Sequence, residues 1–149
     1  MNDIQIRAIH SETDIFNSLS SCANSFFNQR VNNSDTLRNL SKKFSNHGVC
    51  HTINVGEGIA GFVSCYVNDT ITQKGFLSII VVKKEFQGFG FGTLLLDIVL
   101  SSCKIFGMKQ LRLEVDPNNT SAINFYHKRG FLKDESNAHG IINLYKQIH

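Results

Sequence analysis

A strand, a glycine-rich turn and a long helix follow one another in the middle of the chain, and this succession constrains the fold most. Residues 77–82 (Leu-Ser-Ile-Ile-Val-Val) are nearly all apolar, which is typical of a central strand covered on both faces of a sheet. Glycines recur at positions 88, 90 and 92, and a helical pattern of apolar residues runs from about residue 90 to residue 106. The pattern predicts a layered α/β fold.

The remaining segments predict the order β-α-α-β-β-β-α-β-α-β-β. Alternating or continuous apolar residues predict strands at 4–8, 49–55, 59–67, 75–82, 111–115, 131–134 and 141–147. Helical spacing predicts helices that begin after a cap at Ser11, at Ser34 or Asp35, near residue 90, and at Asn119 or Thr120. We expect a single domain over residues 1–149, with a mixed sheet and helices on both of its faces.

The longest predicted helix carries apolar residues at helical spacing. These are Leu94, Leu95, Ile98, Val99, Ser102 and Ile105. They recur at intervals of three and four residues, which places them on neighbouring turns of one helix face.

Composition indicates a core that needs no covalent staple. The chain has 149 residues, 42% of them hydrophobic, and 12 phenylalanines. A chain of this length buries about two-thirds of its unfolded surface. The four cysteines, at positions 22, 50, 65 and 103, form no CxxC pair and are expected to be reduced and mostly buried. Residues 47–51 contain histidines and a cysteine, but no second cluster completes a tetrahedral set, so no metal site is expected.

Charge and hydropathy exclude several classes of partner. The net charge is +3, and the lysines form no stripe of the kind that nucleic-acid binders carry. No apolar run reaches the roughly 20 residues of a membrane-spanning helix. The first residues lack the basic and apolar regions of a signal peptide, so a cytoplasmic location is expected. The oligomeric state is left open between a monomer and a homodimer.

The glycine-rich turn has the character of an anion site. Glycines at alternate positions let successive backbone N–H groups point into one concavity, and the helix that follows adds the positive end of its dipole. Lys83 and Lys84 raise the local potential. The spacing G-x-G-x-G fits neither the dinucleotide fingerprint nor the P-loop. A glycine turn without any ligand is the plain alternative.

Two motifs carry a resemblance to a known family. Gln87, Gly90 and Gly92 fill the pattern Q/R-x-x-G-x-G/A. Downstream, the pattern N-x-x-A-x-x-x-Y-x-x-x-G-F is filled by Asn119, Ala122, Tyr126, Gly130 and Phe131. With these motifs the chain resembles the GNAT family of acyl-coenzyme A-dependent N-acyltransferases over almost its whole length. The resemblance implies a mixed sheet with a splayed pair of central parallel strands, 77–82 and 111–115.

The resemblance also implies acetyl-CoA as co-substrate and a set of residues that hold it. The backbone of Ile80 and Val82 would bind the pantetheine arm, and Asn119 would bind the arm or orient the catalytic acid. The pyrophosphate would lie in the turn formed by Gln87, Gly88, Phe89, Gly90, Phe91, Gly92 and Thr93. In the plain reading, Asn119 caps a helix, and both roles are compatible.

Two residues are candidates for proton transfer. By resemblance Tyr126 would be the general acid that protonates the departing thiolate, with a ring that only packs beneath the cofactor as the alternative. Glu114, twelve residues earlier, is a possible general base, because it resembles a glutamate that serves as base at this spacing in one branch of the family. An apolar strand would also raise the pKa of its carboxyl by desolvation. Alternatively, Glu114 forms a structural ion pair with Arg112 or a lysine. A chain of waters that relays the proton to solvent is a third possibility.

The expected reaction is acetyl transfer to a primary amine by direct attack in a ternary complex. Acceptor choice would lie in residues 24–46, 68–73 and 134–140, which carry the polar residues Asn28, Arg30, Asn137 and His139. Few carboxylates occur there, which disfavours polyamines and aminoglycosides. A polypeptide N-terminus, an amino sugar and a small amine remain open. The alternative function is a coenzyme A-binding sensor or scaffold without turnover.

Overall fold

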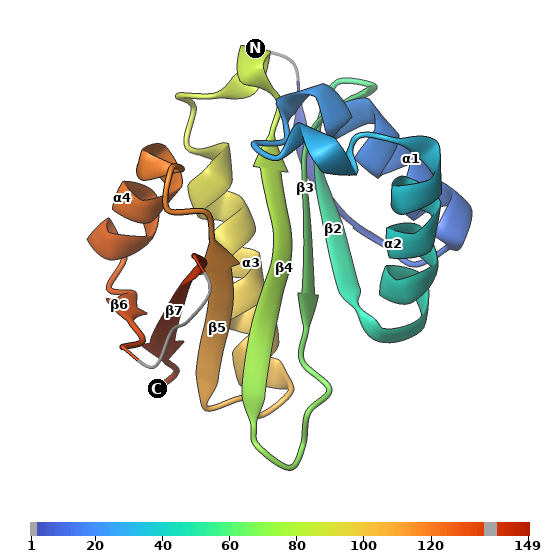
Figure 1. The fold of residues 1–149 in the computed structure, drawn as a ribbon. Coiled ribbons are helices and arrows are strands. Elements are labelled where there is room, and N and C mark those ends of the chain that lie inside the picture. The colour runs from blue at the N-terminus through green and yellow to red at the C-terminus, as the bar shows by residue number, and fades with distance from the viewer. Residues whose placement is uncertain (1–2, 136–139) are drawn as a thin grey trace.

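The computed structural model describes residues 3–135 and 140–149, which form a seven-stranded sheet in the order β1-β2-β3-β4-β5-β7-β6 (Figure 1). The helices are α1 (Glu12–Cys22), α2 (Ser34–His47), α3 (Phe91–Ile105) and α4 (Thr120–Lys128), and short 3₁₀ turns are η1 (Ala23–Ser25), η2 (Gln29–Val31) and η3 (Lys84–Phe86). The strands are β1 (Ile4–Ile9), β2 (Val49–Val55), β3 (Gly58–Tyr66), β4 (Lys74–Val82), β5 (Gln110–Val115), β6 (Leu132–Lys133) and β7 (Ile142–Gln147). Strands β4 and β5 are parallel and the other pairs antiparallel, so the predicted mixed sheet is confirmed.

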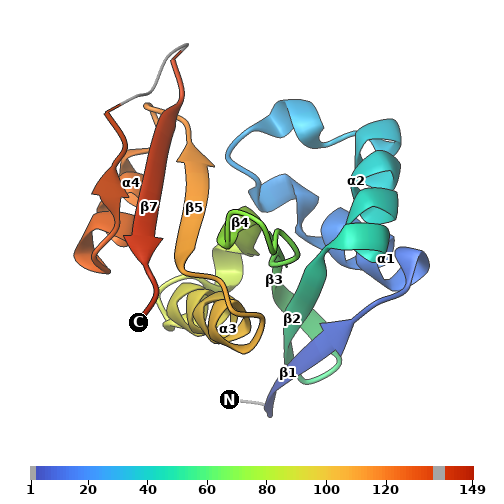
Figure 2. The same cartoon turned by 90° about the horizontal axis from the view of Figure 1, so that it is seen from below.

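Apolar side chains fill one core on each face of the sheet. Between α1, α2 and the sheet, Ile15, Phe44 and Phe62 are almost completely buried. On the opposite face, Leu95 of α3 and Leu111 of β5 belong to the larger core. Figure 2 shows α1 and α2 on one side of β2 to β4 and α3 on the other. The predicted helices on both faces are therefore confirmed.

Two details of the helices differ from the sequence prediction. The cap of α2 is Asn33, whose side-chain oxygen accepts a hydrogen bond from the Thr36 N–H at 2.9 Å, so the helix begins one residue after it. In α3, Leu94 is 38% exposed and Ile105 is 78% exposed, although both belong to the helical pattern of apolar residues. The face that packs on the sheet is instead formed by Phe91, Leu95, Leu96, Val99, Ser102 and Cys103.

A β-bulge lies in β4, where β4 pairs with β3. Cys65 of β3 pairs with Leu77, but the preceding Ser64 pairs with Ile79, which leaves Ser78 as the extra residue on β4. A bulge bends its strand and increases the local twist. The parallel β4–β5 ladder contains four residue pairs and ends at Leu77 and Leu113, just before the bulge. Beyond that point β4 and β5 diverge (Figure 1), which is the expected splay.

The cysteines behave as their spacing predicted. All four thiols are free and buried. In β2, Cys50 belongs to the core beneath α1 and α2, and the neighbouring His51 points to the other face, because side chains alternate along a strand. No helix within the part of the chain that the structure describes has the length and apolar character needed to cross a bilayer.

Candidate functional site

The splay leaves main-chain groups of β4 directed toward β5 without a strand partner. The N–H of Lys83 donates to the Ala60 carbonyl at 2.8 Å, so Lys83 and Val81 direct their backbone polar groups toward β3. By alternation, Ile80 and Val82 direct theirs toward the splay. The Val82 carbonyl accepts a hydrogen bond from Gln87 Nε2 at 3.0 Å. The arrangement offers the edge of a strand to an extended ligand.

The glycine-rich turn leads from the end of β4 into α3 with exposed N–H groups. Gly88 and Gly90 have φ values of +87° and +83°, which favour glycine strongly. Gly90 is the N-cap of α3, and no side chain caps the first turn of the helix. A Cβ added at either glycine would meet no atom within 4 Å, so the turn faces open space. Uncapped N–H groups at the positive end of a helix form an anion site.

Gly92 has a different role from the other two glycines. It lies within the first turn of α3, where a Cβ would contact the ring of Phe125 at 3.4 Å. The side chain of Phe91 is buried in the core, so Phe91 can offer a ligand its backbone but not its side chain. The side chain of Phe89 is exposed. The seven predicted phosphate-holding residues thus form one continuous turn, in which some residues set the backbone conformation and others pack in the core.

Arg129 joins α4 to the start of α3 and was not singled out from the sequence. Its Nη2 donates to the Thr93 hydroxyl at 2.5 Å and its Nη1 donates to the Phe125 carbonyl at 2.9 Å. The guanidinium also lies 3.7 Å from the centre of the Phe125 ring. A cation is thus fixed beside the N-terminal turn of α3. Only tertiary structure reveals this, because 36 residues separate Arg129 from Thr93.

Tyr126 is buried in α4 and is 5% exposed. Its ring packs edge-on against Phe125 and Phe131, with ring centres 5.3 Å and 5.4 Å away. Burial raises the pKa of the phenol far above its usual value. The hydroxyl therefore stays protonated throughout the neutral and mildly alkaline range, as a hydrogen-bond donor requires.

The environment of Glu114 differs from the predicted one. Leu113 and Val115 are buried on the α3 side of β5, so Glu114 points to the opposite face and is exposed. The predicted burial of this carboxylate in an apolar strand is therefore wrong. The alternative, an ion pair of Glu114 with Arg112 or a lysine, is also not found among the described residues, and Arg112 forms its ion pair with Asp134.

Asn119 is the N-cap of α4. Its side-chain oxygen accepts a hydrogen bond from the Ala122 N–H at 3.2 Å, and its own N–H donates to the Asp116 carbonyl at 2.9 Å. The predicted capping role is confirmed. The side-chain NH₂ group is not used in the cap, so the same residue retains two donors close to the end of β5.

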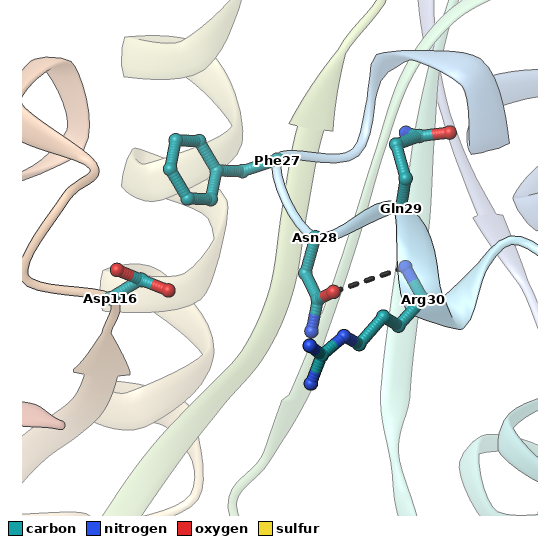
Figure 3. A pocket seen from close by; sticks show the side chains of 5 residues that line it. All are labelled: Phe27, Asn28, Gln29, Arg30 and Asp116. Atoms are coloured by element: carbon teal, nitrogen blue, oxygen red, sulfur yellow. Dashed lines mark hydrogen bonds between the residues drawn. The ribbon is translucent and has the colours of Figure 1, made fainter. Parts of the chain in front are cut away.

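A pocket of about 440 Å³ lies between the η1–η2 segment and the end of β5. It is lined by Phe27, Asn28, Gln29, Arg30 and Asp116, with Asp116 facing the other four across the gap (Figure 3). Asn28 and Arg30 were predicted to lie in an acceptor loop. Phe27 and Gln29 lie in the same predicted segment of residues 24–46, whereas Asp116, which directly follows the predicted strand of residues 111–115, was not predicted to line the site. Asn137 and His139 lie outside the described residues.

The loop that lines the pocket is attached to the segment that follows β4. The N–H of Lys84 donates to the Ser25 hydroxyl at 3.2 Å, which joins the pocket loop to the segment between β4 and the glycines. The sequence model of the acetyltransferase (GNAT) family matches residues 13–131. The chain belongs to the acetyltransferase (GNAT) family. Its predicted membership is therefore confirmed.

Curated relatives match a shorter part of the chain. An N-alpha-acetyltransferase 30 from Schizosaccharomyces pombe is 31% identical over 62 residues, which cover 42% of this chain and 41% of that protein. An N-alpha-acetyltransferase from Sulfurisphaera tokodaii is 33% identical over 72 residues, which cover 48% of this chain and 43% of that protein. The chain thus matches about two-fifths of the length of these relatives.

Among solved structures, the paia N-acetyltransferase of Thermoplasma acidophilum, determined in complex with coenzyme A, is similar over almost its whole length. The TM-score is 0.78 at 19% sequence identity, and the match covers 97% of this chain and 99% of that chain. At this identity the likeness establishes the shared fold.

Proposed function

We propose that the protein transfers an acetyl group from acetyl-CoA to a primary amine by direct attack in a ternary complex. The observation that carries the proposal is the continuity of three features at the end of β4. These are the strand edge at Ile80 and Val82, which pairs with no strand on the β5 side, the start of α3 without a side-chain cap, and the pocket that ends at Asp116. Together they suit an extended amide-containing arm, a phosphate and an acceptor.

The residues present fit acetyl-CoA. Backbone groups of Ile80 and Val82 would pair with the amides of the pantetheine arm, and Asn119 would add side-chain donors. The N–H groups of the turn from Gln87 to Thr93 would hold the pyrophosphate, with Arg129 as a nearby cation. When bound, acetyl-CoA supplies an acyl group activated as a thioester.

Tyr126 would act as the general acid. Its raised pKa keeps the proton on the phenol, which can then be donated to the sulfur as the carbon–sulfur bond breaks. A rigid setting between Phe125 and Phe131 would hold the hydroxyl in one place. Packing and proton donation are therefore compatible roles for this residue.

The attacking amine must lose a proton, because an ammonium group has no free electron pair. Glu114 points away from the α3 core, toward the face of the sheet on which α1 and η1 pack. Asp116 lies two residues further along and lines the pocket. We propose Glu114 as the proton acceptor, with a water chain to solvent as the competing route.

A polypeptide N-terminus is the acceptor class that we favour. Both curated relatives are named N-alpha-acetyltransferases. The pocket also carries one carboxylate, Asp116, among its five lining residues, which suits a single ammonium group better than a polyamine.

The proposal is tested by binding and turnover on the same preparation. Acetyl-CoA should raise the melting temperature by mass action, and thiol release should follow when peptides with a free N-terminus are added. Amino sugars and small amines serve as competing acceptors. Saturable binding without thiol release from any amine would favour the sensor instead. No thermal shift at millimolar acetyl-CoA would contradict both functions.

A further inference from the structure

The loop that walls the pocket is held in shape by its own side-chain amides. Gln29 Nε2 donates to the carbonyls of Ala23 and Phe26 at 3.1 Å and 2.7 Å. Asn32 Nδ2 donates to the side-chain oxygens of Asn24 and Gln29 at 3.1 Å and 3.2 Å. These bonds span the segment from η1 to η2, so the pocket wall is pre-organised before any acceptor arrives.

Two opposite charges line this pocket without pairing with each other. One carboxylate oxygen of Asp116 accepts a hydrogen bond from the Asn118 N–H at 2.8 Å, which leaves the other oxygen to the pocket. The guanidinium of Arg30 forms no ion pair with any described residue. Both side chains are exposed and line the cavity from opposite walls (Figure 3).

The position of Asp116 fixes the direction in which an acceptor would lie. Asp116 directly follows β5, one of the two splayed strands, so an amine held there lies beside the splay. Arg30 belongs to η2 on the far wall and would meet a more distant part of the acceptor. A volume of about 440 Å³ is within the range of about 300–1,000 Å³ that is typical of ligand pockets.

We propose that the preferred acceptor is a polypeptide N-terminus that carries an acidic side chain within its first few residues. Asp116 holds the terminal amino group, Arg30 pairs with the acidic side chain, and the exposed ring of Phe27 packs on the first side chain. This inference rests on the proposed function and names the substrate class of the same site.

The first test compares peptides of one length that differ only at positions two and three. Peptides with glutamate there should be acetylated with a kcat/KM about tenfold higher than peptides with lysine, with glutamine between them, because exposed charge pairs contribute modestly. Arg30→Glu should reverse the order. Arg7→Glu is the matched control, because Arg7 is exposed on β1 and its guanidinium hydrogen-bonds, among the described residues, to the side chain of Gln5. An unchanged preference in Arg30→Glu would overturn the role of Arg30.

The second test removes the charge that holds the amine. Asp116→Asn keeps an oxygen that can accept from the Asn118 N–H, so the turn should survive. We expect KM for every peptide to rise about three- to tenfold, while acetyl-CoA affinity and the melting temperature stay unchanged. Asp97→Asn, exposed on α3, is the control and should leave KM unaltered.

The outcomes separate this inference from the proposed function. If amines are acetylated without any preference for acidic peptides, the acceptor assignment fails and the acetyltransferase function stands. If acetyl-CoA binds but small amines or amino sugars are the only acceptors, the peptide class is wrong. If acetyl-CoA itself does not bind, the proposed function fails first.

Discussion

At the scale of single residues, Tyr126 shows how packing and chemistry can share one side chain. Two phenylalanine rings hold the phenol edge-on, and the burial that results raises its pKa. Glu114 has the opposite environment, because the alternation of β5 turns it to the exposed face. The proposed donor is therefore rigid and dry, and the proposed acceptor of the amine's proton is in contact with water.

Tyr126→Phe should lower kcat by about 10²- to 10⁴-fold, because it removes the proposed proton donor and keeps the ring. The melting temperature should change little, since the contacts with Phe125 and Phe131 remain. In the wild type, the raised pKa of Tyr126 keeps its acid form, so the rate should show no alkaline decline from this group below about pH 10. Steady-state kinetics from pH 6 to pH 10 measure both effects.

Tyr145→Phe is the matched control, because Tyr145 is a half-buried tyrosine on β7 whose ring lies beneath Arg112. It should retain wild-type kcat. Unchanged turnover in Tyr126→Phe would remove the acid role and leave the packing role alone.

At the scale of elements, the start of α3 depends on α4. Arg129 bridges the two helices through Thr93 and stacks on Phe125, whose ring in turn lies against Gly92. The guanidinium of Arg129 thus lies next to the loop that would hold a phosphate. The contribution of Arg129 to binding affinity should therefore depend on the negative charge of the ligand.

Arg129→Gln should weaken the binding of coenzyme A about three- to tenfold, because it removes a partly buried charge beside the phosphate site. Pantetheine, which lacks the phosphates, should bind equally to both proteins. Titration calorimetry at two salt concentrations measures the affinities, and the salt dependence should be smaller in the variant.

Lys128→Gln removes the same charge from the neighbouring exposed position and is the control. Arg129→Lys should recover part of the affinity. An equal loss of affinity for pantetheine and coenzyme A would show that Arg129 acts only on the fold.

Local patterns allowed the element order, the cap at Ser11 and the glycine-rich turn to be predicted, because each depends on neighbouring residues. The exposure of Leu94 and Ile105 could not be predicted, since it depends on where α3 crosses the sheet. The bulge at Ser78 follows from its pairing with β3, and Arg129 acts through a distant helix. Asp116 lines a pocket because the η1–η2 segment lies opposite it, and this depends on tertiary structure.

At the scale of the whole molecule, burial of ionisable groups sets the alkaline limit of stability. Burial raises the pKa of Cys22 to about 11, that of Cys65 to about 12 and that of Cys103 to about 11. In the unfolded chain a thiol titrates near pH 8.5. Each raised pKa contributes stability that is complete below the unfolded value and is lost as the pH rises toward the folded one.

The free energy of unfolding should therefore be constant near neutrality and decline progressively above about pH 9. Urea unfolding at pH 7.5, 9.5 and 10.5 measures this decline, and Cys65→Ala should reduce its slope. The native thiols should also react slowly with iodoacetamide at pH 7.5 and rapidly in urea. Stability that stays constant to pH 10.5 would contradict the prediction.

The short β4–β5 ladder has a mechanical consequence. Among the described residues, four residue pairs, from Lys74 to Leu77 on β4, form the strand pairing between the β1–β4 half of the sheet and the β5–β7 half. The two halves of the sheet are therefore hydrogen-bonded at the start of β4 and separated toward its end. An extended ligand between the separated ends of β4 and β5 would pair with main-chain groups there as an additional strand does. The proposed co-substrate would thereby complete the sheet beside which its acetyl group is transferred.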